Sequence, residues 1–415
     1  MYNVPNKNGF LYLLGDELDL NIQQYLYNKI GRELVDEIYH KKHIKVLVVH
    51  HNDADGEGIK IIWRFLEEMY ANITVEYKEC SINANEAVEP LLLENNINYD
   101  YVFIADLSIT EDYMDRVKAA HESFEFPFKF IILDHHASAK YMNDYNFAAV
   151  IPHDIKGRII SSGTYMTLEY LYPLIFMLPH GIMRRRLVKV CKLITAYDTF
   201  FWDNDECRQV LGLEPLYINY IFKSMNRNDF VEEFVYTILH GANNLDALAT
   251  NVFCKKHETI YSIIESIVKK SYYAVWHNMK VSKKGKYIIA VTYNCNYISE
   301  VGNEILRNIP EIDVMIFIDA DRNSISLCTR KDNIDLSTIA KLHFGGGHQK
   351  AAGFPMVEEQ KNYIEDTMEK AMQIIADPAL INGNESEFVP LYNYEDLYKK
   401  ATADGVDSIA DYIIL

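Results

Sequence analysis

Short apolar runs rich in β-branched residues alternate with amphipathic segments along the first third of the chain. The composition of buried parallel strands is found at Ile44 to Val49, Thr74 to Tyr77, Tyr101 to Ala105 and Phe128 to Leu133. Between the first two strands, Gly58 to Tyr70 carries apolar residues at helical spacing. Strands and helices in this alternation predict an α/β fold with an open parallel sheet and right-handed crossovers.

A second α/β pattern follows a mainly helical stretch that extends from about residue 155 to 280. It predicts strands at Tyr287 to Thr292, Val314 to Asp319 and Ser324 to Thr329, with a helix at Ile298 to Leu306. The domains that we expect are an N-terminal helical segment at 1–42, a catalytic α/β domain at 43–215, a helical linker at 216–284, a smaller substrate-binding α/β domain at 285–377 and a tail at 378–415.

Composition and charge limit the class of partner. The chain has 415 residues, enough for two domains, and its net charge of −18 argues against a surface for long nucleic acid. A short phosphorylated substrate remains compatible, because bound metal ions invert the local field. The longest apolar stretch, Leu168 to Met183, is short and contains Pro173 and Pro179, so no membrane partner is expected. The six cysteines form no Cys-x-x-Cys pair, which predicts reduced thiols and a cytoplasmic protein.

Acidic residues and histidines gather where the predicted strands and helices end. Asp134, His135 and His136 directly follow an apolar strand, the place where α/β proteins put ligands and catalytic groups. Further groups of this kind are His51 with Asp53 and Asp55 after the first strand, Asp106 after the third, and Asp198 after the helix at Leu187 to Ala196. Together they offer ligands for two divalent metals, and a paired metal site indicates phosphoryl chemistry.

Two of these groups also have a structural explanation. The run after the first strand would be a polar loop with an aspartate as helix N-cap, and Asp106 would be a helix-capping acid. Asp198 is different, because a buried acid at a helix end is costly without a partner. The coincidence of all the groups favours a metal centre over separate structural roles.

In their order along the chain, these motifs resemble those of the DHH/DHHA1 phosphoesterase superfamily, over roughly residues 43 to 375. The run Gly345-Gly346-Gly347-His348, followed by Ala351-Ala352-Gly353, is similar to the glycine-rich signature of the DHHA1 domain. The resemblance implies a parallel-sheet DHH domain joined by helices to a smaller α/β DHHA1 domain, with the active site in the cleft between them.

The resemblance also implies roles for individual residues. One Mn²⁺ ion would be held by His51, Asp53 and Asp106. A second would be held by Asp55, Asp106, His135 and Asp198, with Asp106 bridging the pair. The remaining catalytic and substrate-binding candidates are His136 on the scissile phosphate, Asp134 orienting a ligand, and Gly345, Gly346, Gly347 and His348 on the far side of the substrate. Mg²⁺ and Co²⁺ are the expected substitutes for Mn²⁺.

Two positions depart from the family pattern. Phe344 stands where a fourth glycine is common, and Cys328 stands where a substrate-binding arginine is expected. Arg330 or Lys331 would supply the missing charge, although neighbouring side chains on a strand alternate faces.

The function implied is that of the oligoribonuclease (nanoRNase) branch: a metal-activated hydroxide hydrolyses short RNA, short DNA or a dinucleotide to mononucleotides. Three alternatives remain open at this point. They are a phosphodiesterase for cyclic mono- or dinucleotides or linear dinucleotides, a RecJ-like single-strand exonuclease, and a non-catalytic nucleotide-binding protein. The acidic net charge argues against a RecJ-like exonuclease. A non-catalytic nucleotide-binding protein would be expected to lack at least one metal ligand, whereas all six ligand positions are filled here. Homodimerisation is left open.

Overall fold

The computed structural model describes residues 20–40, 43–81, 83–93, 98–123, 128–152, 160–242, 251–284, 286–320 and 322–356. The chain divides into two compact units, Met1–Tyr261 and Ser262–Leu415. The division falls in the segment predicted as a helical linker. The predicted tail at 378–415 lies outside the described residues.

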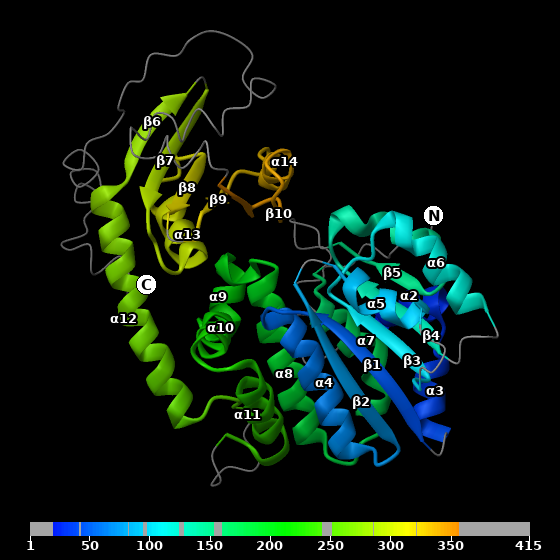
Figure 1. Ribbon diagram of the computed structural model, residues 1–415. Helices are drawn as coiled ribbons and strands as arrows, with labels where there is room; N and C mark the ends of the chain where they lie inside the picture. Colours follow the sequence, from blue (N-terminus) through cyan, green and yellow to red (C-terminus); the bar gives the residue numbers. More distant parts are fainter. Residues whose placement is uncertain are drawn as a thin grey trace. The chain divides into compact units, whose positions relative to one another are not determined.

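The first unit is built on a five-stranded sheet in which every neighbouring pair is parallel (Figure 1). Its strands are β1 (Ile44–His51), β2 (Ile73–Cys80), β3 (Tyr101–Ala105), β4 (Lys129–Asp134) and β5 (Ala148–Val150). The four predicted strands are confirmed, and β5 was missed because three residues carry too little pattern. The order β2-β1-β3-β4-β5 is doubly wound and places its switch point between β1 and β3, where such sheets bind ligands at the strands' carboxyl ends.

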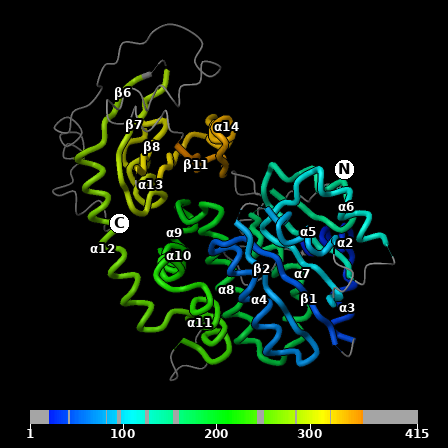
Figure 2. The backbone as a smooth tube through the Cα atoms, in the orientation of Figure 1, coloured from blue at the N-terminus to red at the C-terminus, as the bar shows by residue number. Residues whose placement is uncertain are grey.

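Helices cover both faces of this sheet, because alternate strand residues point to opposite sides. Val46 and Val48 pack into one core, and Leu47 and Val49 into the other. The first core involves α2 (Leu20–Ile30), α3 (Glu33–His40), α4 (Ala54–Met69), α7 (Gly163–Phe176), α8 (Gly181–Asp198), α10 (Glu214–Ser224) and α11 (Arg227–His240). The second involves α5 (Asn85–Leu93), α6 (Glu111–Glu122) and the 3₁₀ segment η1 (Ala137–Asp144), and Figure 2 follows the chain through these layers.

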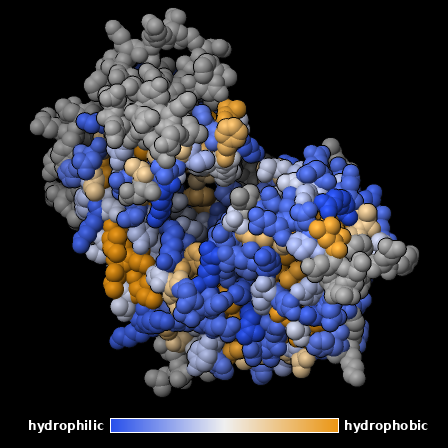
Figure 3. Space-filling model, viewed as in Figure 1, coloured by the Kyte–Doolittle hydropathy of each residue, from blue (hydrophilic) through white to orange (hydrophobic). Residues whose placement is uncertain are grey.

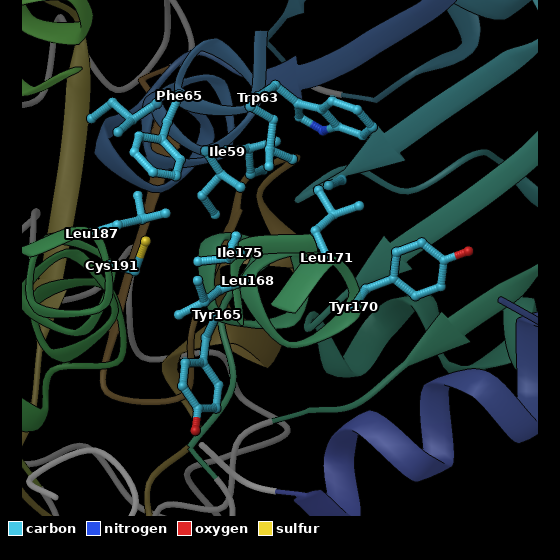
Figure 4. Packing of buried hydrophobic residues seen from close by; sticks show 14 of the residues in the cluster. Ile59, Trp63, Phe65, Tyr165, Leu168, Tyr170, Leu171, Ile175, Leu187 and Cys191 are labelled. Carbon is cyan, nitrogen blue, oxygen red and sulfur yellow. The ribbon is translucent and has the colours of Figure 1, made fainter. Parts of the chain in front are cut away.

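The contact between α4, α7 and α8 fixes the carboxyl edge of the sheet. Figure 4 shows Ile59 and Trp63 of α4 packed with Leu168 and Leu171 of α7, all of them buried. Complete burial of such a side chain contributes about 1.5–3 kcal/mol. Close approach depends on Gly58, since a Cβ there would lie 2.2 Å from Thr164 Oγ1. The first turns of α4 and α7 are therefore locked together.

The second unit carries a mixed six-stranded sheet in the order β10-β11-β9-β8-β7-β6, in which only the β7–β8 pair is parallel. Its elements are β6 (Lys280–Lys284), β7 (Tyr287–Tyr293), α13 (Ile298–Asn308), β8 (Val314–Asp319), β9 (Ser324–Cys328), α14 (Leu336–Leu342), β10 (Gly346–Gly347) and β11 (Ala351–Pro355). The predicted strands and helix are confirmed, whereas the lysine-rich edge strand β6 gave no apolar signal.

Two helices pack on one face of this second sheet and one on the other. The long helix α12 (Lys255–Asn278) and α13 share a core with β6, β7 and β8, and α14 packs on the opposite face. Within the part of the chain that the structure describes, every helix is too short or too polar to cross a bilayer.

Candidate active site

The loop after β1 is shorter than predicted, because α4 begins at Ala54 and not at Gly58. Asp53 is the N-cap of this helix, and its Oδ1 accepts a hydrogen bond of 3.0 Å from the Gly56 N–H. Its other oxygen, Oδ2, lies 2.9 Å from His51 Nδ1. The capping role and the position beside His51 therefore belong to the same carboxylate.

The two glycines of this motif, Gly56 and Gly58, allow close packing at the end of β1. A Cβ on Gly56 would lie 1.9 Å from the His51 carbonyl oxygen. Helix α4 therefore starts directly against the end of β1. Gly58 has a similar role, because its lack of a Cβ lets α7 pack closely on α4. Neither glycine has a positive φ.

Asp106 lies at the centre of the site, just beyond the end of β3. Its Oδ1 is 3.0 Å from His135 Nε2, and its Oδ2 is 3.9 Å from His51 Nδ1. Its backbone is left-handed, with φ +61°, a conformation that is strained for any residue other than glycine. It does not cap a helix, since Thr110 is the N-cap of α6. Asp106 thus connects the residues of β1 with those of β4.

The first turn of α7 holds Asp55, a contact that the sequence reasoning missed. The N–H groups of Gly163 and Thr164 donate to the two oxygens of Asp55 at 2.6 and 3.0 Å. Orphan amides at a helix N-terminus bind a carboxylate well. The available signal was Ser162, an N-cap type of residue directly before an apolar run, and it does cap α7.

Replacing Gly163 by alanine is expected to disrupt the site while the protein stays folded. The new Cβ would lie 2.4 Å from Asp106 Cβ and 3.0 Å from Asp55 Oδ2, so at least one carboxylate must move. A displacement of this kind typically costs about 10²-fold in rate. Metal titration by calorimetry and circular dichroism would check the prediction. Gly181→Ala, at an open position at the start of α8, is the matched control. Undiminished metal affinity in Gly163→Ala would contradict it.

His135 and Asp198 complete the buried cluster. The Nε2 atom of His135 is 3.6 Å from Oδ2 of Asp198, the last residue of α8, and 3.9 Å from Asp55 Oδ2. His135 is 2% exposed and Asp55 1%, so these charges are withdrawn from water. Burial raises the pKa of Asp55 to about 6, with Asp53 adding to the shift, and raises the pKa values of Asp106 and Asp198 well above their usual range.

Asp134 has a different place from the other acids. Its Oδ1 accepts from the backbone N–H groups of His135 and His136 at 2.7 and 3.2 Å, and lies 2.8 Å from His136 Nδ1. Burial is the largest single effect and lowers the pKa of His136, but the bond to Asp134 together with the negative charges of Asp134, Asp53 and Asp55 outweighs it, so that pKa is raised. Asp134 thus orients His136 and keeps it cationic to higher pH.

The residues fit the requirements of divalent cations. Ligand atoms of His51, Asp53 and Asp106 lie within 4.8 Å of one another, and so do those of Asp55, His135 and Asp198. Buried Oδ2 atoms of Asp106 and Asp198 accept no hydrogen bond from the described residues. Carboxylates packed this closely repel each other unless positive charge lies between them. The structure thus brings together all six predicted ligands, and Asp106 faces both groups.

One more group of potential ligands, Glu233, Cys254 and His257, lies elsewhere in the first unit. The Cys254 N–H donates to His257 Nδ1 at 3.2 Å, which leaves the proton of a neutral imidazole on Nε2. That Nε2 lies 2.9 Å from Glu233 Oε1, and Lys256 also pairs with Glu233. A protonated nitrogen does not ligate metal, so we assign this group to a structural contact between a neutral His257 and Glu233.

The glycine run of the second unit continues from the end of α14. Gly345 and Gly347 are both required, since a Cβ would lie 2.1 Å from the Gly353 oxygen at the first and 2.7 Å from the Ala351 oxygen at the second. Gly346 faces open space, and the His348 N–H donates to the Ala351 oxygen at 2.8 Å. The predicted loop therefore lies flat along β11.

The two candidates for replacing the missing arginine, Arg330 and Lys331, differ in their surroundings. Cys328 is buried against α13, where a Cβ on Gly302 would lie 2.5 Å from its Sγ. Lys331 is turned away, with its Nζ donating to the Pro310 oxygen at 2.7 Å. Arg330 is exposed, and its carbonyl oxygen accepts from Lys350 Nζ at 3.0 Å, which places its backbone beside the end of the glycine run.

A doubly wound domain with a histidine–carboxylate cluster at its switch point is followed by a mixed-sheet domain with a glycine run, the architecture that the resemblance to the DHH/DHHA1 phosphoesterases implies. The chain is similar to proteins of the DHH/DHHA1 superfamily. It is 25% identical to oligoribonuclease NrnB of Bacillus subtilis over 312 residues, which cover 74% of this chain and 72% of NrnB. It is 23% identical to an uncharacterized protein of Acanthamoeba polyphaga mimivirus over 77% of this chain and 69% of that protein.

Among solved structures, RecJ of Thermus thermophilus in complex with Mn²⁺ has the same fold, with a TM-score of 0.51 at 14% identity. That match covers 90% of this chain and 57% of the RecJ chain. No family model matches the sequence.

Proposed function

We propose that this protein is a metal-dependent phosphodiesterase that hydrolyses short oligonucleotides to mononucleotides. The observation that carries the proposal is the position of Asp106, whose two oxygens face two separate groups of ligands at the β1/β3 switch point. A carboxylate shared by two groups is the arrangement that a pair of ions about 3.5–4 Å apart requires.

The residues of the site have distinct parts in this proposal. His51, Asp53 and Asp106 would hold one ion, and Asp55, Asp106, His135 and Asp198 the other. The ions would supply an acidified water as nucleophile and neutralise the phosphate oxygens. Mixed imidazole and carboxylate ligands suit Mn²⁺, with Mg²⁺ or Co²⁺ as substitutes.

His136 acts on the substrate side of this centre. The Asp134 carboxylate fixes the ring through Nδ1, and the raised pKa of His136 keeps it protonated in more of the neutral range. It therefore donates a hydrogen bond to a non-bridging phosphate oxygen. Charge-assisted bonds of this type are about twice as strong as neutral ones.

Two observations support a short substrate. The chain carries a net charge of −18, whereas a surface that follows many phosphates needs an excess of lysine and arginine. Its similarity to NrnB, named as an oligoribonuclease, extends over most of both chains. We therefore propose that the preferred substrates are short oligonucleotides.

The proposal is tested by hydrolysis of end-labelled RNA and DNA from two to about twenty nucleotides, with Mn²⁺ and with EDTA. The expected result is a Mn²⁺-dependent rate that is highest for two to about five nucleotides and is lost in His135→Ala. The matched control is His240→Ala, an exposed histidine at the end of α11. A rate that grows with length would favour an exonuclease for long strands. No hydrolysis of linear substrates beside cleavage of cyclic dinucleotides would replace the proposed substrate.

A further inference from the structure

A pocket in the first unit lies at the amino ends of β3 and β4, at the end of the sheet opposite the candidate metal ligands. Its volume is about 420 Å³, which is in the range of small-molecule sites. The turn at Gly31, helix α3 and the end of α6 complete its wall. Tyr101 begins β3 and lines the pocket, whereas Asp106 follows the end of the same strand. The length of a strand therefore separates this pocket from the candidate active site.

The base of the pocket belongs to the protein core, and its rim is charged. Leu34, Tyr101 and Ile131 line the base and are buried, while Glu33 and Lys129 at the rim are exposed. Figure 3 shows that the surface of the first unit in that view is mainly hydrophilic, with hydrophobic side chains only in patches. A largely apolar base with a few polar groups around it is the composition of a site for a small molecule.

Two carboxylates of α3 give one side of the pocket a negative charge. Glu33 and Glu37 lie one helical turn apart, a spacing at which like charges repel each other. The Tyr101 hydroxyl donates to Glu37, and burial followed by the two carboxylates raises the pKa of Tyr101. Glu33 is turned back over the bend that precedes α3, where a Cβ on Gly31 would lie 2.0 Å from its Oε2. The glycine thus leaves room for a carboxylate at the pocket.

The other side of the pocket offers hydrogen-bond donors and a positive charge. It is formed by the end of α6 and the start of β4, and α6 packs on the face of the sheet opposite to α3. The Phe130 N–H donates to His121 Nδ1 at 3.1 Å, which leaves the proton of a neutral ring on Nε2. Burial, followed by the charge of Lys129, lowers the pKa of His121 and keeps the ring neutral. Lys129 Nζ donates to the His121 carbonyl oxygen at 3.0 Å, a neutral partner.

Glu33 and Lys129 have opposite charges and line the same pocket, yet neither forms an ion pair with any residue that the structure describes. A ligand with charges of both signs would pair with each of them. We infer that this pocket binds a small zwitterion of the size of an amino acid, with its ammonium group at Glu33 and Glu37 and its carboxylate at Lys129 and His121. The inference is independent of the proposed function, because no residue of the pocket belongs to the candidate active site.

Calorimetric titration of the metal-free protein in EDTA with each of the common amino acids tests the inference without hydrolysis. One equivalent of at least one amino acid is expected to bind. Its N-acetyl derivative has no ammonium group, and its amide has no carboxylate. Each derivative is expected to bind at least about tenfold more weakly, because it loses one charge-assisted contact.

Two variants assign the charges. Glu33→Gln is expected to weaken binding of the amino acid about tenfold or more and to leave the N-acetyl derivative unaffected. Lys129→Gln is expected to weaken the amino acid to a similar degree and to leave the amide unaffected. Glu111→Gln and Lys118→Gln, exposed positions of α6, are the matched controls. Circular dichroism verifies that all four variants are folded.

Three results would overturn the inference. The first is that no amino acid binds to wild type. The second is equal affinity for the amino acid and its two derivatives, and the third is unchanged affinity for the amino acid in both Glu33→Gln and Lys129→Gln. None of these results bears on the phosphodiesterase activity, which is measured separately with Mn²⁺.

Discussion

Replacing Asp106 by asparagine is expected to reduce the phosphodiesterase rate by about 10²–10³-fold or more, because one substitution removes a charged ligand from both metal groups. The same change is expected to raise the stability of the metal-free protein. Burial, together with Asp55, Asp53 and Asp198, disfavours the ionised form of Asp106, as its strongly raised pKa indicates. Asparagine has the same shape and no charge, so it relieves this repulsion.

Both effects are measurable on one preparation. Steady-state hydrolysis with Mn²⁺ gives the rate, and thermal unfolding in EDTA gives the stability of the metal-free form. Asp112→Asn, an exposed acid in the first turn of α6, is the matched control and should change neither by much. A destabilised Asp106→Asn protein in EDTA would show that Asp106 is held by bonds within the protein and not poised for a cation.

The stability of the metal-free protein is expected to depend on pH through Asp55. Its pKa is raised from 3.8 to about 6, so between these values the folded state binds more protons than the unfolded state. Stability from this group is therefore fully present below about pH 4 and is lost as pH rises through about 6. A shift of about two units corresponds to about 3 kcal/mol. Bound Mn²⁺ reverses the trend, because it binds the ionised carboxylates and competes with protons.

Urea unfolding of wild type and Asp55→Asn between pH 4 and 8, in EDTA and in Mn²⁺, checks this prediction. The difference in unfolding free energy between the two proteins isolates Asp55 from the other titrating groups. In EDTA, wild type should lose about 3 kcal/mol relative to the variant as pH rises. In Mn²⁺ at about 100 times Kd, wild type should gain about 2.7 kcal/mol at neutral pH. If the difference in unfolding free energy between the two proteins did not change with pH in EDTA, the N–H groups of α7 would be sufficient to stabilise the ionised Asp55 carboxylate.

The residues of the two candidate ligand groups could be predicted from the sequence because they occur next to strong local patterns. Apolar β-branched runs end directly before Asp106 and Asp134 and one residue before His51, and parallel strands bring their carboxyl ends to one edge. The contacts that hold these residues in place could not be predicted, because they join segments that lie far apart in the sequence. Gly163 lies far from Asp55 in sequence, in a segment whose apolar residues predict only a helix, and the packing of α7 on α4 brings the two together.

The glycine-rich segment illustrates the opposite difficulty. The departure at Phe344 was visible in the sequence, yet its left-handed backbone, with φ +61°, and its exposure of 88% could not be predicted from a residue pattern. Similarly, the sequence after β9 gives no reason to prefer Arg330 over Lys331 as the substitute cation. The structure distinguishes them, because the Lys331 ammonium donates to the Pro310 oxygen. Strand β6 escaped prediction because an edge strand needs few apolar residues.

The ligands of the cluster come from β1, the end of β3, the end of β4 and the last residue of α8, so the site spans His51 to Asp198. No contiguous segment carries enough of them to retain an ion in the unfolded chain. Metal capture would consequently be a late event in folding, because the group of Asp55, His135 and Asp198 forms only once α8 has docked. Once bound, the ions would act as a cross-link among distant segments and retard unfolding of the first unit. Loss of metal would thus shorten the lifetime of the folded protein as well as silence it.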